Sequence, residues 1–484
     1  MTTAAQPIRN RHLVRAVTAT VLFAAATAGA DDVSELRERL EAQEQKIRVL
    51  ERKLELQDEA TKAAVPTTPV VRASPQQGFR IQSADAANVV RLRGVLHFDG
   101  RHYFDDVTPE TADTWILRRV RPTIEGTLNG IYDYRFTPDF AGGRTIILDA
   151  YAAARLKPWA VITAGKFKVP VGLERLVSAN DLRFIERALP TSLLPNRDLG
   201  LQLSGDIAGG VVNYSVGYFN GVSDGSSSDS NLPTGDAQND TKGDWAARVF
   251  FQPFLTSDNF ALRNLGFGVA GTFVDSTGGP VVTLLPSYRT PGQQTFFSYR
   301  ATVPAVGTTP AVNGTFADGD RIRWTPQAYY SVGSFGVLGE YVNVSQDVTR
   351  STPTAGVRSE TLDHTAWQVQ FAWFATGEDE QFRGFTPGAV FSLDNHTWGA
   401  LELVARYHEL DIDDATFAGG TDSFANPDSA ASKASAWGVG VNWYLNQNYK
   451  WSLNYDVTSF EGGAAGGADR PDEKALFTRF ALQF

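Results

Sequence analysis

Hydrophobic and polar residues alternate with a period of two in many segments between residues 79 and 484. The last segment has one apolar face and one more polar face. The apolar face carries Leu476, Phe480, Leu482 and Phe484, and the other carries Arg479, Ala481 and Gln483. Successive side chains of a β-strand point to opposite sides of a sheet, so this pattern predicts antiparallel strands.

The first 30 residues have a different pattern. Arg9, Arg11 and Arg15 precede a short, largely apolar run that ends in the sequence Ala-Gly-Ala at residues 28–30. This order predicts a secretory signal peptide. The alternative is a membrane anchor, but the run is well below the roughly 20 apolar residues that a spanning helix needs.

Residues 31–60 follow a heptad pattern. The a positions are Val33, Leu40, Ile47 and Leu54, and the d positions are Leu36, Gln43, Leu50 and Gln57. This seam is narrower than the stripe that a globular helix normally buries, so we expect a coiled coil that associates with its own copies, rather than a helix lying on its own domain. Residues 61–78, with Pro66, Pro69 and Pro75, are expected to form a linker.

The 406 residues from 79 to 484 are expected to form one barrel domain. The alternating segments are about ten residues long, the length of a tilted strand that crosses a bilayer. A propeller should show repeats of roughly 40–50 residues, which the sequence lacks, whereas alternation alone does not exclude a soluble sandwich. The signal peptide, the aromatic strand ends and the terminal Phe484 favour an all-β transmembrane antiparallel barrel of about 16 strands, preceded by a short N-terminal α-helical coiled coil.

Charge changes this picture in one respect. The chain has 44 Lys and Arg against 54 Asp and Glu, a net charge of −10, and loss of residues 1–30 leaves 41 basic residues, a charge near −13. This balance argues against binding to nucleic acid. Any function that needs positive charge must therefore come from local charge. The absence of Cys excludes a disulfide scaffold and a thiolate metal site.

Short motifs follow one another along the barrel region. They occupy residues 93–100 (RGVLHFDG), 117–121 (LRRVR), 148–151 (LDAY), 165–170 (GKFKVP), 184–187 (FIER), 195–200 (PNRDLG), 218–221 (YFNG), 324–327 (WTPQ), 339–341 (GEY), 376–378 (TGE), 442–444 (NWY) and 478–480 (TRF). In order and spacing, these motifs resemble the phosphate-selective porin O and P family of outer-membrane anion channels.

The resemblance implies a homotrimer of 16-stranded barrels in the outer membrane of a Gram-negative bacterium. We expect no cofactor, and we expect the coiled coil to lie in the periplasm. It implies passive diffusion of inorganic anions, phosphate or polyphosphate among them, through a constriction lined by Arg and Lys. It also implies contact with outer-membrane lipid and with the assembly machinery, which would recognise Phe484 at the end of the last strand.

The alternation independently predicts a basic lumen. If Val120, Ile124 and Leu128 face lipid, Arg119 and Arg121 face the lumen. The same reasoning, with Ile146, Leu148, Ala150 and Ala152 outward, turns Asp149, Tyr151 and Arg155 inward. With Val161, Phe167 and Val169 outward, it turns Lys166 and Lys168 inward. Arg118 has the opposite parity, which indicates a place at the rim or at a bulge.

Residues 178–199 are less periodic and contain prolines, so we expect them to fold into the barrel as a constriction loop. The resulting candidate pore-lining residues are Arg118, Arg119, Arg121, Asp149, Lys166, Lys168, Arg183, Arg187 and Arg197. Arg offers tetrahedral oxyanions a planar fork of donors, and Lys adds a movable charge. The alternative is that these charges pair across the lumen and brace the wall.

Two other functions are alternatives to an anion channel. A general or sugar-type diffusion porin would combine aromatic residues with mixed charges at the constriction. An outer-membrane barrel enzyme would need a catalytic site, yet the six histidines form no known motif, and the spacing of His97 and His102 puts the two rings on opposite faces of a regular strand. No metal site is expected.

Overall fold

The structure is a computed structural model, which describes residues 30–63, 69–74, 78–104, 112–143, 145–228, 242–307, 311–382 and 384–484. The expected signal peptide lies outside these residues except for Ala30. The chain divides into two compact units, Met1–Thr68 and Pro69–Phe484.

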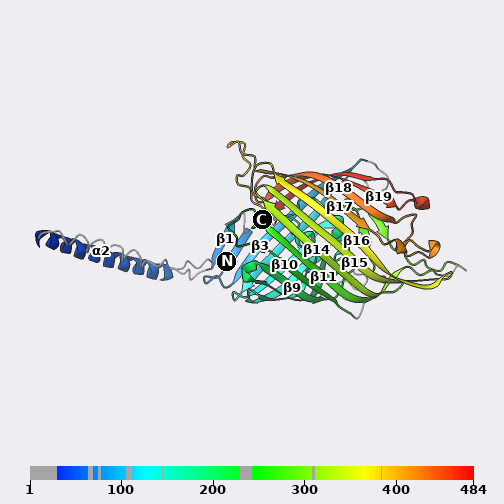
Figure 1. Ribbon diagram of the computed structural model, residues 1–484, viewed down its shortest axis with the longest axis horizontal. Helices are drawn as coiled ribbons and strands as arrows, with labels where there is room; N and C mark the ends of the chain where they lie inside the picture. Colours follow the sequence, from blue (N-terminus) through cyan, green and yellow to red (C-terminus); the bar gives the residue numbers. More distant parts are fainter. Residues whose placement is uncertain are drawn as a thin grey trace. The chain divides into compact units, whose positions relative to one another are not determined.

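Sixteen antiparallel strands in the described part of the second unit form a closed barrel (Figure 1). They are β3 Val89–Tyr103, β4 Thr114–Leu128, β5 Tyr132–Asp139, β6 Ile146–Lys157, β7 Ala160–Lys168, β8 Arg197–Ile207, β9 Val212–Phe219, β10 Asp244–Phe251, β11 Leu265–Thr277, β14 Phe316–Val332, β15 Phe335–Thr352, β16 Gly356–Phe374, β17 Ala400–Asp411, β18 Ala431–Tyr444, β19 Tyr449–Gly462 and β20 Glu473–Gln483. Each strand pairs with the next, and β20 pairs with β3. The prediction of an all-β barrel of about 16 strands is confirmed.

Four shorter strands accompany the barrel. β1 (Val70–Ser74) and β2 (Gly78–Gln82) form a hairpin whose second strand pairs with the start of β3. The sheet therefore includes residues 70–74 and 78, for which the sequence predicts a linker. β12 (Ser287–Arg289) and β13 (Thr295–Ser298) form a separate two-stranded sheet between β11 and β14. Short 3-10 turns lie at Ala141–Gly143, Ala208–Gly210, Asp414–Thr416, Gly420–Asp422 and Ala465–Gly467.

The strands separate their side chains as the alternation predicts. In β16, Trp367, Phe371 and Trp373 are exposed on the outer face, whereas Gln368 and Gln370 are buried inside the barrel. Several strands are longer than the expected ten residues, and β16 has 19. A strand rises about 3.3 Å per residue, so the longest ones extend beyond the roughly 30 Å hydrocarbon layer even when tilted.

The segment between β7 and β8 lies inside the barrel. It runs through residues 169–196 and contains α3 (Leu173–Leu176) and a 3-10 helix, η3 (Leu189–Leu193). The backbone N–H of Ile185 donates to Asn454 Oδ1 in β19 at 2.7 Å, and that of Leu189 donates to His408 Nδ1 in β17 at 3.2 Å. These contacts tie the segment, hereafter the infolded loop, to the opposite wall. It starts earlier than the predicted residue 178, and its end is set by Arg197, the first residue of β8.

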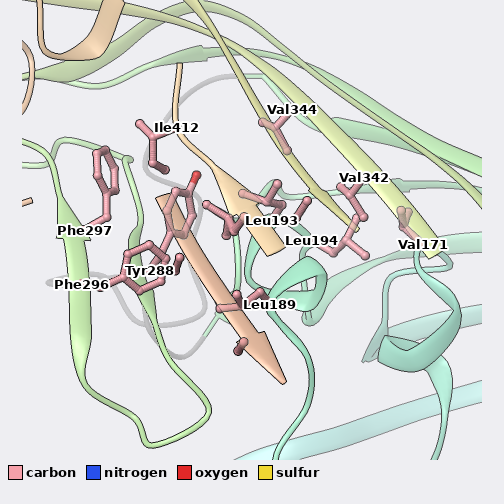
Figure 2. Close-up of a cluster of buried hydrophobic side chains, with 14 of the residues drawn as sticks. Val171, Leu189, Leu193, Leu194, Tyr288, Phe296, Phe297, Val342, Val344 and Ile412 are labelled. Atoms are coloured by element: carbon pink, nitrogen blue, oxygen red, sulfur yellow. The ribbon is translucent and has the colours of Figure 1, made fainter. Parts of the chain in front are cut away.

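Hydrophobic residues fill the lumen on one side of this loop (Figure 2). Leu193 and Leu194 of the infolded loop pack in one cluster with Val342 and Val344 of β15. Phe296 and Phe297, from the segment between β11 and β14, belong to the same cluster and are fully buried. The barrel interior therefore contains an apolar core, which we call the apolar side of the lumen.

In the first unit, one helix, α2, spans Ala30–Ala63. All its side chains from residue 37 to residue 56 are exposed in the single chain, including the heptad residues Leu40, Ile47, Leu50 and Leu54. The predicted helix is present, and its association into a coiled coil stays a prediction. Among the described residues, no helix combines the length and hydrophobicity needed to cross a membrane.

Candidate functional site

A cavity of about 1770 Å³ occupies the lumen next to the infolded loop. Among the described residues, eleven basic and five acidic side chains line it. The basic ones are Arg93, Arg101, Arg118, Arg119, Arg121, Arg135, Lys168, Arg175, Arg187, Arg197 and Arg289. Most of them come from β3 to β8 and from the infolded loop. This part of the interior, which we call the basic side of the lumen, has the opposite charge to the chain as a whole.

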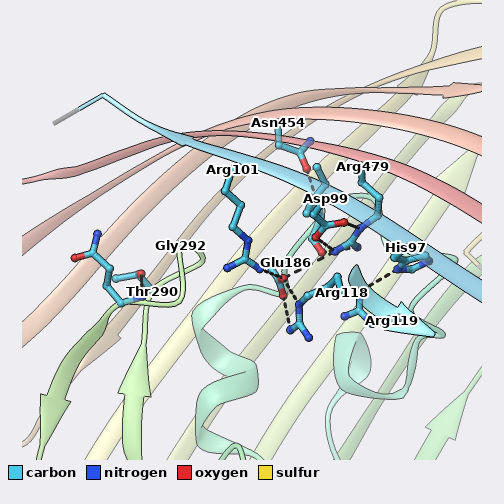
Figure 3. A network of polar contacts seen from close by, with 12 residues as sticks. His97, Asp99, Arg101, Arg118, Arg119, Glu186, Thr290, Gly292, Asn454 and Arg479 are labelled. Carbon is cyan, nitrogen blue, oxygen red and sulfur yellow. Dashed lines mark hydrogen bonds and ion pairs between the residues drawn. The ribbon is translucent and has the colours of Figure 1, made fainter. Parts of the chain in front are cut away.

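Glu186, in the infolded loop, is the centre of an ionic network (Figure 3). Its carboxylate accepts from Arg101 at 3.0 Å and from Arg118 at 2.7 Å. Burial by itself would raise the pKa of Glu186, but Arg118, Arg119 and Arg101 outweigh it and hold this pKa well below its usual range. The loop is thus held to the wall by a carboxylate that stays ionised.

The wall residues of this network are arranged by a bulge. His97 of β3 pairs with Arg119 of β4, but Phe98 pairs with Leu117, so Arg118 is an extra residue on β4. An extra residue leaves the normal alternation, and both Arg118 and Arg119 therefore line the cavity. Of the two places that the sequence allows for Arg118, the structure shows the bulge. Arg119 donates to His97 Nδ1 at 3.0 Å.

Three cations beside the infolded loop are held by backbone carbonyls. Lys168 donates to the carbonyl oxygens of Arg175 and Val177, both at 2.8 Å. Arg187 donates to the carbonyl oxygen of Val177 at 2.8 Å, and Arg175 donates to that of Thr191. Burial lowers the pKa of Arg175 to about 9 and that of Arg187 to about 10, so both stay charged at neutral pH.

These three side chains differ from the other cations of the cavity in their partners. Arg121 pairs with Asp139 at 2.7 Å, and Arg197 pairs with Asp149 at 2.8 Å. Lys168, Arg175 and Arg187 form no ion pair with a carboxylate in the part of the chain that the structure describes. Carbonyl dipoles orient a cation without cancelling its net charge, so these three add to the excess of positive charge that lines the cavity.

Comparison with known proteins agrees with this architecture. Residues 90–484 match the sequence model of the family described as phosphate-selective porin O and P. The chain belongs to this family. It is accordingly a porin of the Gram-negative outer membrane.

Individual relatives are more distant. Porin O of Pseudomonas aeruginosa is 28% identical over 159 residues, which are 32% of this chain and 33% of that protein. An uncharacterized protein of Caulobacter vibrioides is 21% identical over 481 residues, covering 92% of this chain and 88% of that one. Among solved structures, an anion-selective porin from Comamonas acidovorans shares 13% identity with a TM-score of 0.47, covering 82% of this chain and all of that one.

The porin's candidate residues fall into two groups. Seven of the nine line the large cavity: Arg118, Arg119, Arg121, Asp149, Lys168, Arg187 and Arg197. Arg183 lies instead beside a smaller cavity, where it forms ion pairs with Glu380 and with Glu402, the latter at 3.4 Å. Lys166 is buried but does not line the large cavity.

On β7 and directly after it, the predicted outward faces of Phe167 and Val169 are wrong, whereas Lys168 lines the cavity as predicted. Ile162 is exposed on the outside, whereas Thr163 and Phe167 line the cavity and Val169 is buried in the apolar core. The alternation also breaks after Gly165, whose φ of +127° is accessible mainly to glycine. Lys166 and Phe167 are consequently both buried.

A second face assignment fails in β6 for a related reason. Thr137 of β5 pairs with Asp149, but Pro138 pairs with Ile147, so Leu148 is the extra residue of a bulge. Leu148 therefore lines the cavity beside Asp149 instead of facing lipid. A bulge has no fixed signature in a single sequence. A strict alternation of inward and outward residues therefore assigns Leu148 to the wrong face.

Several lining residues are missing from the sequence prediction. Arg101 and Arg135 have inward parity on β3 and β5 and could have been found by extending the alternation to those strands. Arg175 and Glu186 lie on the infolded loop, where alternation carries no information. Their positions depend on tertiary contacts.

Phe484 occupies the closing seam of the barrel. Its N–H and carbonyl oxygen form hydrogen bonds with the carbonyl oxygen and N–H of Gly94, both at 3.1 Å. Its ring lies over Gly94, where any Cβ atom would approach the ring to 2.4 Å. The ring also meets Phe79 edge to face. The proposed role of Phe484 as an assembly signal stays a prediction.

Proposed function

We propose that inorganic anions, phosphate or polyphosphate among them, diffuse passively through this porin. The observation that carries the proposal is the excess of positive charge that lines the cavity beside the infolded loop. Lys168, Arg175 and Arg187 line the cavity and are held by carbonyl oxygens rather than by carboxylates. A permeating anion can therefore pair with these three cations, which form no ion pair with a described carboxylate.

The net charge of −10 does not oppose this function. Exposed charges farther away than a Debye length, about 8 Å at physiological salt, are largely screened. Charges that line a narrow lumen are screened much less and raise the local concentration of counter-ions. Conduction also needs several moderate binding positions rather than one tight site, and cations spread over β3 to β8 provide them.

Reversal potential in a planar bilayer tests this proposal. With a KCl gradient, we expect the wild-type reversal potential to show anion preference, and we expect Arg187→Gln to reduce it. Gln can still donate to the loop carbonyl, so the change is mainly in charge. The matched control is Arg155→Gln, because Arg155 is exposed, pairs with Asp133 at 2.7 Å and does not line the cavity. A wild-type barrel without anion preference would instead favour a general or sugar-type diffusion porin.

We further propose that the porin is a homotrimer and that residues 31–60 contribute to its assembly in the periplasm. The heptad residues Leu40, Ile47, Leu50 and Leu54 are exposed in one chain and would be covered by other copies. Deletion of residues 31–60 should leave a folded barrel with a less heat-stable oligomer, measured by cross-linking and by gel mobility after heating. An oligomer of unchanged size and heat stability would contradict this role.

A further inference from the structure

Two buried histidines join the infolded loop to the barrel wall. His97 of β3 lies beside Asn180 of the loop, and its Nε2 atom is 2.9 Å from Asn180 Oδ1. His408 of β17 lies beside Leu189 of the loop, whose backbone N–H donates to His408 Nδ1 at 3.2 Å. Both rings are almost completely buried. The loop is therefore anchored to two separate strands through imidazole rings.

The partners of each ring fix its protonation. At His97, Nδ1 accepts from the guanidinium of Arg119, so the proton is on Nε2, which donates to Asn180 (Figure 3). At His408, Nδ1 accepts from a backbone N–H, so the proton is again on Nε2. A neutral imidazole has one donor and one acceptor nitrogen, whereas the protonated ring has two donors. Both anchors thus require the neutral ring.

A proton added to His97 would meet positive charge. The charged groups that act on its ring are Arg119 of β4, Lys450 of β19 and Arg479 of β20. Asp99, on the same strand as His97, is already paired with Arg479 at 2.7 Å. A protonated ring would place an N–H against the N–H of Arg119 and add a further positive charge to this group of cations.

His408 is surrounded differently but leads to the same result. The charged group that acts on its ring is Arg406, on the same strand. Gln368 of β16 and Ala436 of β18 lie opposite His408 and carry no charge. Gln368 donates to two carboxylates, those of Glu174 and Glu340, both at 3.2 Å. A protonated His408 would face the N–H of the loop with Nδ1, and its buried Nε2 has no hydrogen-bond partner among the described residues.

We propose that His97 and His408 are positioning residues that hold the infolded loop at the pore only while their rings are neutral, so that acid releases the loop. The proposal rests on the proposed anion channel, because the loop borders the cavity assigned to the anions. A histidine ring in water has a pKa of about 6.5. The rings face the barrel interior, so a released loop exposes them to the water of the lumen. Each ring then favours the released loop by up to roughly 100-fold at pH 4.5.

Single-channel current at pH 7.5 and at pH 4.5 tests this proposal with the full chain in a planar bilayer and KCl as the electrolyte. We expect one steady open level at pH 7.5. At pH 4.5, the fraction of time spent away from that level should rise at least about tenfold, as the loop leaves its anchored position. Glu186 does not explain such a change, because its carboxylate stays ionised. A wild-type channel that behaves identically at both pH values would overturn the proposal.

His408→Asn and His97→Asn separate the two rings from other groups that acid protonates. The Oδ1 atom of Asn can replace Nδ1 as the acceptor, and it takes up no proton in this pH range. Each variant should match the wild type at pH 7.5 and spend roughly tenfold less time away from the open level at pH 4.5. The control is His396→Asn, because His396 is exposed in the segment between β16 and β17. It should keep the full acid response.

The outcomes separate this proposal from the proposed function. A wild-type acid response in both His408→Asn and His97→Asn would overturn the role of the rings, even if the reversal potential shows anion preference. A reversal potential without anion preference at pH 7.5 would contradict the anion channel. The acid response of the loop is measured in the same channels and does not depend on which ion carries the current.

Discussion

The infolded loop contacts both sides of the lumen, but through different kinds of side chain. On the basic side, the infolded loop presents Glu186 and Arg187 to a wall of arginines and to a large cavity. On the apolar side, it presents Leu189 and Leu193 to hydrophobic residues of the opposite wall. The pore is therefore not the whole lumen but the part that this packing leaves open.

The difference shows what each kind of contact contributes. Apolar packing has no direction and gains stability with the area removed from water, so it can fix the loop as a rigid body. Ion pairs and carbonyl contacts are directional, so they can fix where individual charges point. We infer that the apolar side sets the position of the loop and that the basic side sets which ions pass it.

The largest expected effect is that of removing the central carboxylate of the basic side. Glu186→Gln leaves Arg101 and Arg118 without their shared partner. Breaking a buried ion pair in this way costs about 3–5 kcal/mol. We expect a lower unfolding temperature and a noisier single-channel current. Asp258→Asn is the control, because Asp258 is exposed in the turn after β10. A quiet channel with wild-type heat stability would show that the apolar side alone holds the loop.

A smaller effect is expected from a cavity on the apolar side. Leu193 is fully buried, and Leu→Ala in such a position costs about 2–5 kcal/mol. We expect Leu193→Ala to lower the unfolding temperature and to leave the reversal potential unchanged, because no charge moves. Leu193→Met, which nearly conserves volume, should be close to wild type. A change in ion preference without a change in stability would contradict the division between the two sides.

Much of the barrel is predictable from the sequence because lipid on one side and water on the other impose alternation. The faces of β16 and β20 follow it: Trp367 and Phe480 are exposed, while Gln368 and Arg479 are buried. The apolar side is not predictable in this way. Val342 and Val344 of β15 face the interior, where a rule of polar residues inside and apolar residues outside expects polar groups.

The basic side could be predicted in part. Arg119 and Arg121 lie on a regular stretch of β4, so counting by two assigns them to the lumen, where the structure has them. Leu148 is assigned to the wrong face because a bulge interrupts the alternation of inward and outward residues on β6. Phe167 is assigned to the wrong face because the alternation on β7 is assumed to begin with an outward residue. Arg175 and Glu186 depend on contacts with segments far away in the chain. A local pattern carries no information about such contacts.

The smallest expected effect comes from the two lysines of β7, which differ by only two positions. Lys168 lines the cavity and Lys166 does not, although both are at least half-buried. Lys168→Gln should reduce anion preference in the reversal potential, since the amide can still donate to the loop carbonyls while the charge is lost. Lys166→Gln removes the same charge from a position that ions do not pass, so we expect a smaller shift. Equal shifts from the two variants would mean that Lys166 also faces permeating ions, and a larger shift from Lys166→Gln would place the selective charge on the other side of β7.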